Sequence, residues 1–493
     1  MKIFSVEQIR AIDKHTIEQE PILSIDLMER AALACSNWLV SNFEPNKNYF
    51  IFCGKGNNGC DGLAIARILL KNNFNVQVFV FNEDKRSADN QTNFDLLKQN
   101  FPNCISVVND VNDLKRINFT NSVCVDALLG TGLTTEITGI YHETIAFLNT
   151  INCTKVAIDM PSGLFADALK VQKQTVFKAN FTLSFQFPKL AFLFLENYQF
   201  VGNFILLDIK LNQSLFQNHL PEFCYTDVLE IHELNKIKTK FSHKGTNGHA
   251  LLIVGSNDKT GAAVLSANAT LKSGCGLVTV ASTANTILAL QANLPEAMCV
   301  GAGSEEYITE LPKLEKYNAL AIGCGIGLEK QTANVLKLLI QDAKIPMVID
   351  ADAITLLAEN KTWLSFLPAN TILTPHIKEL ERLIGKCADS FERLEKTKQF
   401  VLKYNCIVII KGAHTAIAAP NAPIYFNSTG NAVMAKGGSG DVLTGLITGL
   451  LAQGYSPWHA AIIAVYKHGA AADYLVENQN FNSILPSHLC EYF

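Results

Sequence analysis

The chain has 493 residues, of which 48% are hydrophobic and 17% are charged, and its formal net charge is -4. This balance excludes a disordered chain, and without any Lys- or Arg-rich run the sequence lacks the electrostatic signature of nucleic-acid or anionic-membrane binding. Because the length exceeds the usual size of one domain, we expect two α/β domains that act on small molecules.

Cysteine usage and the N-terminal segment bear on the cellular compartment. The 13 cysteines never occur as CxxC, which argues against a disulfide framework and a zinc ribbon. The first twenty residues mix acidic, polar and apolar side chains and do not resemble a signal peptide, and no apolar run reaches the length of a membrane span. We therefore expect a cytoplasmic protein with reduced thiols and no membrane or nucleic-acid partner.

The first half of the chain begins with two helical patterns, at residues 6–20 and 25–40, which predict a helix pair that packs against a sheet or a partner subunit. Short apolar runs then alternate with amphipathic helical patterns. These runs lie at residues 49–54, 76–81, 122–130, 155–163, 181–187 and 204–209. Such alternation predicts a doubly wound, largely parallel sheet covered on both faces, that is, a Rossmann-like three-layer sandwich.

The apolar rhythm lapses between residues 211 and 240, and we place the domain boundary there, with one domain at 1–225 and the other at 226–493. After the boundary the alternation of strands and helices starts again. The apolar runs lie at residues 249–256, 276–282, 319–325, 346–352, 371–376 and 406–412. The second half is therefore predicted to be another doubly wound α/β domain.

A glycine-rich segment precedes a long apolar helical pattern near the C-terminus. Gly437, Gly438, Ser439 and Gly440 stand directly before Asp441, where the helical pattern opens. Glycines let backbone amides face an anion and the helix start adds its dipole, so the segment predicts a phosphate site. Asp441 would act as a general base that takes a proton from a hydroxyl attacking phosphorus. The alternative is a tight turn in which Asp441 only caps the helix.

The segment GGSGD resembles the signature of the ribokinase-like superfamily, in which this aspartate is the catalytic base. Within that superfamily the second half of the chain resembles the NAD(P)H-hydrate dehydratases at further segments in the family's order. These segments are HKGTNGHALLIVGS, TGAAVLSANATLKSGCGLVTV, LPEAM, GCGIGL, VIDADAI, ILTPHIKELERL and VIIKGAHTAI. The chain departs from the family at Cys324, where proline is usual. The resemblance implies a ribokinase-like fold for residues 226–493.

The resemblance also implies the residues of the dehydratase site. The hydrated nicotinamide nucleotide would be bound by Ala262, Gly325, His376 and Asp441, and the adenine nucleotide by Lys411, Gly412, Ala413, His414, Thr415 and Gly440. From the residues alone, His376 could instead pack a loop. Asp350 and Asp352 could be turn and helix-cap residues, and we leave them outside the site.

The implied chemistry follows from hydration, which leaves a secondary alcohol on carbon 6 of the nicotinamide ring. Hydroxide is a poor leaving group, so ADP or ATP with a magnesium ion would first phosphorylate the alcohol. The ring nitrogen would then expel phosphate, which restores NADH or NADPH and releases AMP or ADP. Either nucleotide remains open as the donor.

In the first half, an Asn- and Gly-rich turn follows the strand at 49–53 and leads into a helix near Asp61, an arrangement suited to phosphate or ribose. Asp126, Asp159 and Ser162 end two further strands and would face the same sheet edge. Asn58, Asp126 and Ser162 offer three hard oxygen donors, which suit potassium or sodium better than zinc.

These segments resemble the stations of the NAD(P)H-hydrate epimerase family, over roughly residues 1 to 220, with Cys60 where that family has glycine. The resemblance implies that Asn58, Asp126 and Ser162 bind potassium. It also implies a substrate-binding set made of Asn57, Asn58, Gly59, Cys60, Asp61, Gly130, Thr131, Gly132, Leu133, Thr134, Thr135, Glu136 and Asp159. Asp159 and Lys189 are our candidate acid and base for epimerising carbon 6. The alternative is a surface lysine and a turn-capping aspartate.

Two other functions stay open on the sequence. A vitamin-precursor or sugar kinase would share GGSGD and Asp441, although the pairing of both motif sets fits one repair pathway. Domains related to the first half also occur as dimeric binding modules in mRNA-decapping scaffolds. We expect a homo-oligomeric enzyme whose partners are hydrated NADH or NADPH and ADP or ATP.

Overall fold

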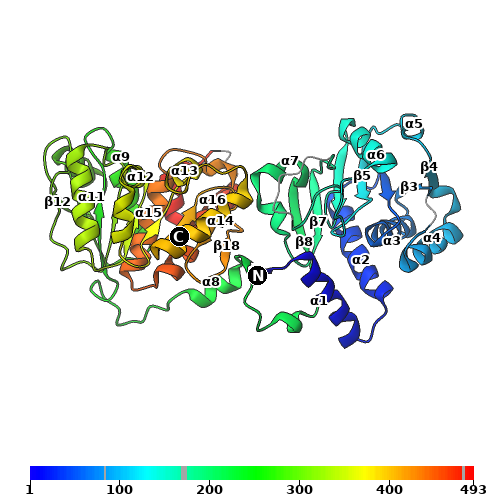
Figure 1. The fold of residues 1–493 in the computed structure, drawn as a ribbon, viewed down its shortest axis with the longest axis horizontal. Helices are drawn as coiled ribbons and strands as arrows, with labels where there is room; N and C mark the ends of the chain where they lie inside the picture. The colour runs from blue at the N-terminus through cyan, green and yellow to red at the C-terminus, as the bar shows by residue number, and fades with distance from the viewer. Residues whose placement is uncertain (83–84, 168–174, 480–482) are drawn as a thin grey trace. The chain divides into compact units, whose positions relative to one another are not determined.

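The computed structural model describes residues 1–82, 85–167, 175–479 and 483–493 (Figure 1). Contacts within it divide the chain into two compact units, Lys2–Pro221 and Glu222–Phe493, and Met1 groups with the second. The division lies close to residue 225, where the sequence analysis puts the domain boundary.

The first unit is built on a sheet with strand order β4-β3-β2-β5-β6-β7-β8, in which every neighbouring pair is parallel. The strands are β2 (Asn48–Cys53), β3 (Asn75–Phe81), β4 (Ile105–Val108), β5 (Ser122–Ala127), β6 (Thr154–Ile158), β7 (Phe181–Phe185) and β8 (Asn203–Leu207). The chain runs outward from β2 to β4 and then returns to add β5 on the other side of β2. The crevice between β2 and β5 is therefore the switch point at which doubly wound sheets bind ligands.

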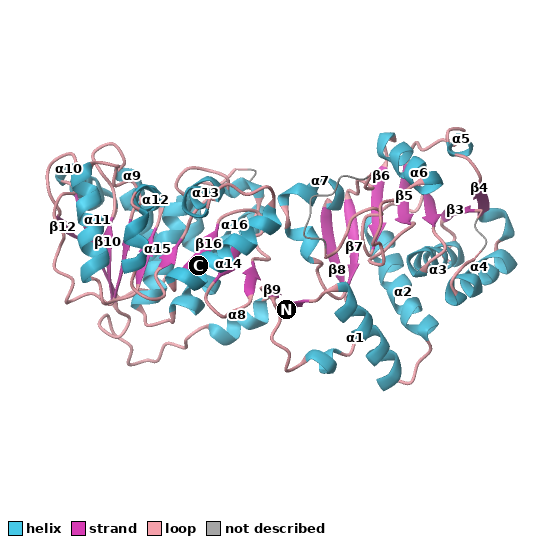
Figure 2. Ribbon diagram, viewed as in Figure 1, coloured by secondary structure: helices cyan, strands magenta, loops and turns pink. Residues whose placement is uncertain are grey.

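Helices cover both faces of this sheet (Figure 2). They are α1 (Val6–Gln19), α2 (Ser24–Asn42), α3 (Asn57–Lys71), α4 (Ala88–Asn100), α5 (Val111–Leu114), α6 (Gly139–Thr150) and α7 (Tyr198–Val201). On one face Ile51 packs with Leu39 of α2 and Leu63 of α3, and on the other Phe52 packs with Leu148 of α6. Because alternate residues of β2 are buried on opposite faces, the predicted three-layer sandwich is confirmed.

The second unit contains the parallel strand order β12-β11-β10-β13-β14-β15-β16. An antiparallel pair, β17 and β18, extends it beyond β16, and β9 pairs in parallel with β18. The strands are β9 (Phe223–Tyr225), β10 (His249–Ile253), β11 (Leu277–Ser282), β12 (Met298–Gly301), β13 (Ala319–Ile322), β14 (Met347–Ile349), β15 (Ile372–Leu373), β16 (Ile407–Ile410), β17 (Ala416–Ala418) and β18 (Ile424–Phe426). The parallel, doubly wound part agrees with the prediction, whereas the antiparallel extension is not foreseen by the sequence analysis.

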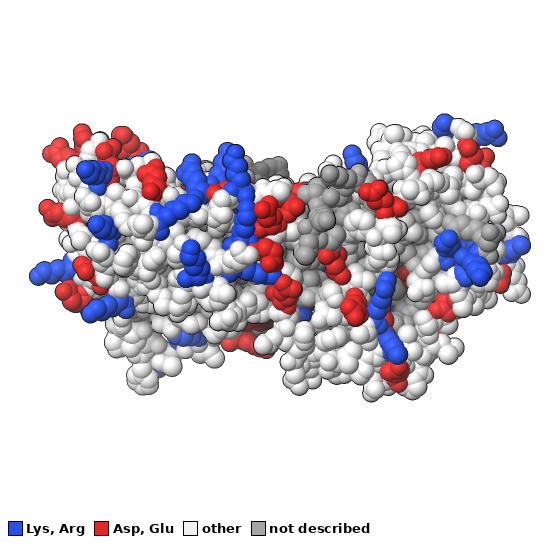
Figure 3. Space-filling view, viewed as in Figure 1, with Lys and Arg blue, Asp and Glu red and all other residues white. Residues whose placement is uncertain are grey.

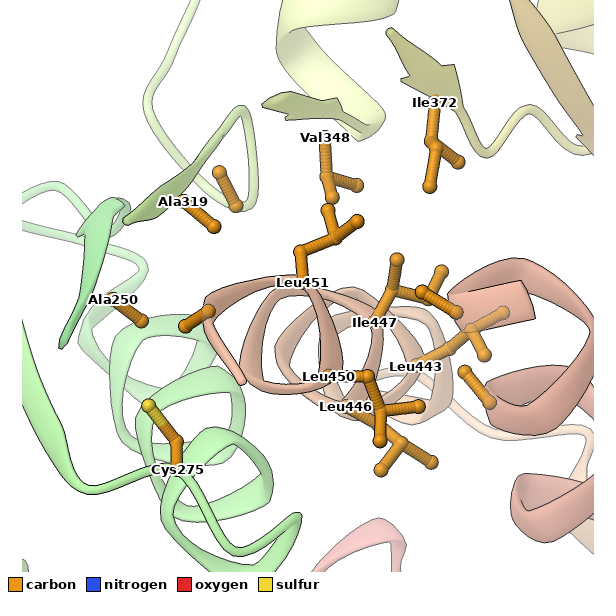
Figure 4. Close-up of a cluster of buried hydrophobic side chains, with 14 of the residues drawn as sticks. Ala250, Cys275, Ala319, Val348, Ile372, Leu443, Leu446, Ile447, Leu450 and Leu451 are labelled. Atoms are coloured by element: carbon orange, nitrogen blue, oxygen red, sulfur yellow. The ribbon is translucent and has the colours of Figure 1, made fainter. Parts of the chain in front are cut away.

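The helices of this unit are α8 (Val228–Leu234), α9 (Thr260–Lys272), α10 (Ala284–Asn293), α11 (Lys330–Asp342), α12 (Ala351–Glu359), α13 (Ile377–Ile384), α14 (Ser390–Tyr404), α15 (Ser439–Ala452), α16 (Pro457–Gln479) and α17 (Pro486–Leu489). Every residue of α15 after Asp441 is buried. Its Ile447 and Leu451 belong to one core with Ala319 and Val348 of the sheet (Figure 4). A Cβ on Gly445 would lie 2.1 Å from the Ser266 carbonyl oxygen, so a glycine is needed for α15 to approach α9 this closely.

Both signs of charge are interspersed on the face drawn in Figure 3. Among the helices of the described ranges, none combines the length and apolar character needed to cross a membrane.

Candidate active sites

Asp441 lies in the first turn of α15, which follows the glycine-rich segment as predicted but begins two residues earlier, at Ser439. Gly438 precedes the helix with φ +98°, a left-handed conformation that favours glycine. Burial raises the pKa of the Asp441 carboxyl to about 6; a hydrogen bond from the Cys324 thiol and the charge of Lys411 oppose this rise, and the charges of Asp350 and Asp352 add to it. At neutral pH the group is therefore an ionised carboxylate that can accept a proton.

Asp350, at the carboxyl end of β14, is 1% exposed and lies at the centre of the second unit's polar cluster. Lys411 Nζ donates to its Oδ1 at 2.8 Å, and Thr444 Oγ1 donates to its Oδ2 at 2.8 Å. Burial disfavours the ionised form, but the charge and hydrogen bond of Lys411 outweigh it and lower the pKa of Asp350. The structure thus brings Asp350 beside the predicted Lys411 and Gly440, since a Cβ on Gly440 would lie 3.3 Å from Lys411 Nζ. Asp350 also caps α12, the role that its sequence context predicts, although it is not part of the predicted site.

The other predicted residues of this unit lie at neighbouring strand ends. Gly325, with φ +67°, follows β13, and a Cβ there would be 3.1 Å from the Cβ of Ala262 on α9. His376 caps α13 by accepting a hydrogen bond from the Glu379 backbone N–H at 3.2 Å through Nδ1, and its side chain stays 52% exposed. Its backbone bridges to that of Lys411, and the exposed ring is not packed inside a loop.

The segment after Lys411 forms a turn held by its own side chains. Thr415 Oγ1 donates to the Gly412 carbonyl at 3.0 Å, and His414 Nδ1 lies 3.2 Å from the Asn427 carbonyl oxygen. Burial lowers the pKa of His414, so its ring is neutral at physiological pH. Gly412 and Ala413 are exposed at the tip of the turn, where a nucleotide could reach them.

The first unit contains a pocket of about 570 Å³ at the carboxyl ends of its strands. The wall includes the predicted residues Asn57, Asn58, Asp61, residues 130–135, Asp159 and Lys189. Gly59, Cys60 and Glu136 lie outside the residues that form this wall. Cys60 is buried on the far side of α3, where its sulfur accepts a hydrogen bond from Asn93 Nδ2 at 3.2 Å, so its thiol does not narrow the pocket.

Asp159 and Lys189 form an ion pair at the pocket, with Lys189 Nζ 2.8 Å from Asp159 Oδ1. Lys189 is only 1% exposed and also donates to Ser184 Oγ at 2.8 Å. Asp159 adopts a left-handed backbone with φ +62°, a strained conformation for a residue other than glycine. The alternative of a surface lysine is wrong, because Lys189 is held inside the unit by two polar partners.

Of the three predicted potassium ligands, Asn58 lines the pocket wall, whereas Asp126 and Ser162 are outside that wall and are hydrogen-bonded to each other. Asp126 is fully buried and accepts hydrogen bonds from the Ser162 backbone N–H at 2.7 Å and from Ser162 Oγ at 2.6 Å. Burial raises the pKa of Asp126 to about 6 although Ser162 opposes the rise. Asn58 is 7% exposed, and within the described residues neither its Oδ1 nor its Nδ2 has a hydrogen-bond partner. A Cβ on Gly130 would lie 3.2 Å from Asn58 Cβ and 3.5 Å from Asp159 Oδ2, so the Asn58 and Asp159 side chains both lie close to Gly130.

Helix α1 also contributes to this pocket, a role that is not predicted from the sequence. Ile9, Asp13 and Ile17 repeat at helical spacing and all three line the wall, as does Arg10. Burial raises the pKa of Asp13 to about 6, with a further rise from the charge of Asp159 and a decrease from Lys189. The signal in the sequence is a carboxylate on the apolar stripe of an amphipathic helix.

Comparison with known proteins follows the same division of the chain. A family model described as NAD(P)H-hydrate dehydratase matches residues 250–493, and one described as YjeF-related protein N-terminus matches residues 24–191. A solved structure of a ribokinase-like superfamily protein from Enterococcus faecalis is 28% identical, with TM-score 0.49, and the match covers 55% of this chain and 94% of that one.

Curated relatives match over the full length. The bifunctional NAD(P)H-hydrate repair enzyme Nnr of Moorella thermoacetica is 32% identical over 511 residues, covering 100% of this chain and 96% of the relative. The protein of the same name from Coxiella burnetii is 31% identical, covering 99% of this chain and 97% of the relative. The chain therefore belongs to the family of bifunctional NAD(P)H-hydrate repair enzymes, as the motifs of its two halves predict.

Proposed function

We propose that this chain repairs hydrated NADH and NADPH. The Lys2–Pro221 unit interconverts the R and S epimers, and the Glu222–Phe493 unit dehydrates the S epimer at the expense of ADP or ATP. One observation carries the proposal: a buried acid–base pair, Asp159 with Lys189, and a buried carboxylate at a helix start, Asp441, stand in one chain at the ligand-binding ends of two doubly wound sheets. A kinase acting on an unrelated alcohol would have no use for the first of these sites.

In the dehydratase unit, Asp441 takes the proton of the carbon 6 hydroxyl as the hydroxyl oxygen attacks the terminal phosphorus of the nucleotide. The N-terminal amides of α15 and the Lys411 ammonium offset the negative charge of the phosphates. The lone pair of the ring nitrogen then expels phosphate, and loss of a ring proton restores the dihydropyridine. The products are NADH or NADPH, phosphate, and AMP or ADP.

The proposed binding residues surround this reaction centre. Ala262, Gly325 and His376 bind the hydrated nicotinamide nucleotide, and the turn at 411–415 with Gly440 binds the adenine nucleotide. The phosphate oxygens of the bound nucleotide would supply most of the ligands that a magnesium ion prefers.

In the epimerase unit, Asp159 and Lys189 exchange protons with the substrate while carbon 6 opens and recloses or loses and regains water. Their 2.8 Å ion pair places a carboxylate that can accept a proton beside an amino group that can donate one. The burial of Lys189 supports this role, because a lysine that water does not reach cannot serve as a charged surface residue. Asn57, Asp61 and residues 130–135 bind the nucleotide part of the substrate along the pocket wall.

A potassium ion is proposed at Asn58, Asp126 and Ser162. The unpartnered, buried Oδ1 of Asn58 fits this assignment, because a buried polar atom without a partner is costly unless a ligand satisfies it. The raised pKa of the buried Asp126 fits as well, since a cation would stabilise its ionised form. The ion would offset the charge of Asp126 and hold the Asn58 loop in shape for the substrate.

The cellular compartment and the oligomeric state of the enzyme are also proposed. All 13 cysteines are free thiols in the structure, which supports a reducing cytoplasm. Leu23, directly before α2, and Leu33 of α2 are 69% and 50% exposed, and they support a homo-oligomer in which another copy covers them.

The test uses separated R and S epimers and the full-length protein. Without nucleotide, each epimer should convert to the equilibrium mixture, followed by chromatography, with no gain of dihydronicotinamide absorbance. With ADP or ATP and magnesium, absorbance should appear together with one phosphate per NADH formed. Absence of both reactions, or phosphorylation of a simple sugar at a comparable rate, would contradict the proposal.

A further inference from the structure

Two cysteines of the first unit stand in direct contact at a place that the repair reaction does not use. Cys124 lies in β5, Cys153 lies in the short connection between α6 and β6, and their sulfur atoms are 3.1 Å apart. Cys124 is fully buried, whereas Cys153 is half-buried. The pair is thus one protected thiol touching one accessible thiol.

The accessible sulfur opens onto a second cavity. Cys153 lines a pocket of about 770 Å³ with Ser122, Thr154, Phe181 and Asn203, which start β5, β6, β7 and β8. The pocket therefore lies at the amino ends of the strands, whereas Asp126 and Asp159 lie at their carboxyl ends. A small solute can reach Cys153 without entering the epimerase pocket.

The surroundings favour the thiolate at Cys153. The hydrogen bond between the two sulfur atoms and the charge of Lys155 lower the pKa of Cys153, although burial opposes the change. Lys155 is itself only 8% exposed and donates to the Ile151 carbonyl, which keeps its ammonium near the pair. A thiolate held by a buried cation and a second thiol is the arrangement found in reactive cysteines.

We propose that Cys124 and Cys153 form an oxidisable dithiol that reacts with hydroperoxides and closes to a disulfide. The Cys153 thiolate attacks one peroxide oxygen, the O–O bond breaks, and Cys153 becomes a sulfenic acid while hydroxide leaves. The Cys124 sulfur then attacks the sulfenic sulfur, the S–O bond breaks, and the departing hydroxide takes the Cys124 proton as water. In sum, two thiols and hydrogen peroxide give one disulfide and two waters.

The movement that this needs is small. A disulfide bond is about 2.05 Å long, so the sulfur atoms must approach by about 1 Å. Cys124 is fixed in a central strand, but Cys153 belongs to a connection of a few residues that can yield. Because the partner thiol is already in contact, the sulfenic acid is resolved before it can oxidise further.

The positions of the tryptic cleavage sites on either side of the two cysteines allow a direct test. No Lys or Arg stands between Arg116 and Lys155, so trypsin releases Cys124 and Cys153 in one peptide, residues 117–155, and it contains no other cysteine. The reduced full-length protein is exposed to equimolar hydrogen peroxide, unfolded in denaturant, blocked there with N-ethylmaleimide and digested without reductant. We expect this peptide to lose both maleimide tags and to be lighter than the reduced peptide by two hydrogen atoms, and dithiothreitol should restore both tags.

Cys387 provides the internal comparison, because it is also half-buried but donates to the Gly385 carbonyl instead of a thiol. It should keep its tag under conditions that consume the pair. In Cys124→Ser, Cys153 should stop at the sulfenic acid and be captured by dimedone, whereas in Cys387→Ser the disulfide should form as in the unchanged protein. Retention of both tags in peptide 117–155 while Cys387 is oxidised would overturn the proposal, and so would addition of oxygen atoms to this peptide without loss of two hydrogens.

Discussion

Replacing Asp441 with asparagine removes the proposed base and keeps the shape of the side chain. A positioned general base contributes about 10²- to 10⁴-fold to rate, so dehydration should fall by that factor, equivalent to about 3 to 5 kcal/mol of transition-state stabilisation. ADP and ATP should still bind, because the amides of α15, Lys411 and the turn at 411–415 are unchanged.

The same substitution has a calculable effect on stability. The pKa of Asp441 is raised from 3.8 to about 6 in the folded protein, so ionisation disfavours the folded state. The contribution of this group to stability is complete below pH 3.8 and is lost as the pH rises through about 6. The asparagine of the variant carries no such charge, so at pH 7 we expect the variant to be more stable than the unchanged protein by up to about 2 kcal/mol after allowance for partial solvent exposure.

The experiment therefore measures two quantities that the substitution should change in opposite directions, because dehydration activity should fall while stability should rise. Dihydronicotinamide absorbance reports dehydration, and thermal unfolding with and without ATP reports stability and nucleotide binding. Asp389→Asn is the matched control, because Asp389 caps α14 in the same unit and asparagine caps a helix equally well. A variant at Asp441 with near-normal turnover, or one that loses activity together with nucleotide binding and stability, would refute the assignment of this residue as the base.

Three further predictions concern the other parts of the account. Asp126→Ala should raise the apparent KM for epimerisation by about tenfold, as expected when a positioning contact is lost, and leave dehydration unchanged; equal damage to both activities would contradict the cation site. Cys324→Ala removes the thiol that donates to Asp441, so the acidic limb of the dehydration pH profile should move upward by about half a pH unit, and an unmoved limb would show that this bond does not act on the base. A fragment ending at Pro221 should epimerise without nucleotide, and one beginning at Glu222 should dehydrate only the S epimer; two insoluble or inactive fragments would contradict independent units.

Local patterns in the sequence were enough to predict most of the parallel strands and a helix start near Asp441, but not the short strands β4 and β12. Alternation of apolar runs with helical patterns predicts both doubly wound sheets, because each run is buried on two faces. The glycines before Asp441 predict a helix N-terminus, and α15 begins there. These features depend on neighbours in the sequence, so the sequence alone contains the information.

Features that depend on distant partners were not predicted. Asp350 is a helix cap by its local sequence, and only the approach of Lys411 and Thr444 from two other elements places it in the polar cluster. Asp13 enters the first pocket because α1 packs beside the strand ends, and Cys60 faces away from that pocket because Asn93 of α4 lies behind it. The ion pair of Asp159 and Lys189 joins two residues thirty positions apart, and its burial excludes a surface lysine.

The central claim is that one chain carries both activities, and the R epimer of hydrated NADH tests it most directly. The full-length protein is given the pure R epimer with ATP and magnesium, and dihydronicotinamide absorbance is followed to completion. The account predicts full recovery of NADH by the unchanged protein, and recovery no faster than spontaneous epimerisation in Lys189→Met, which should still dehydrate the S epimer at the normal rate. Full and rapid recovery from the R epimer in Lys189→Met, or none in the unchanged protein, would contradict it.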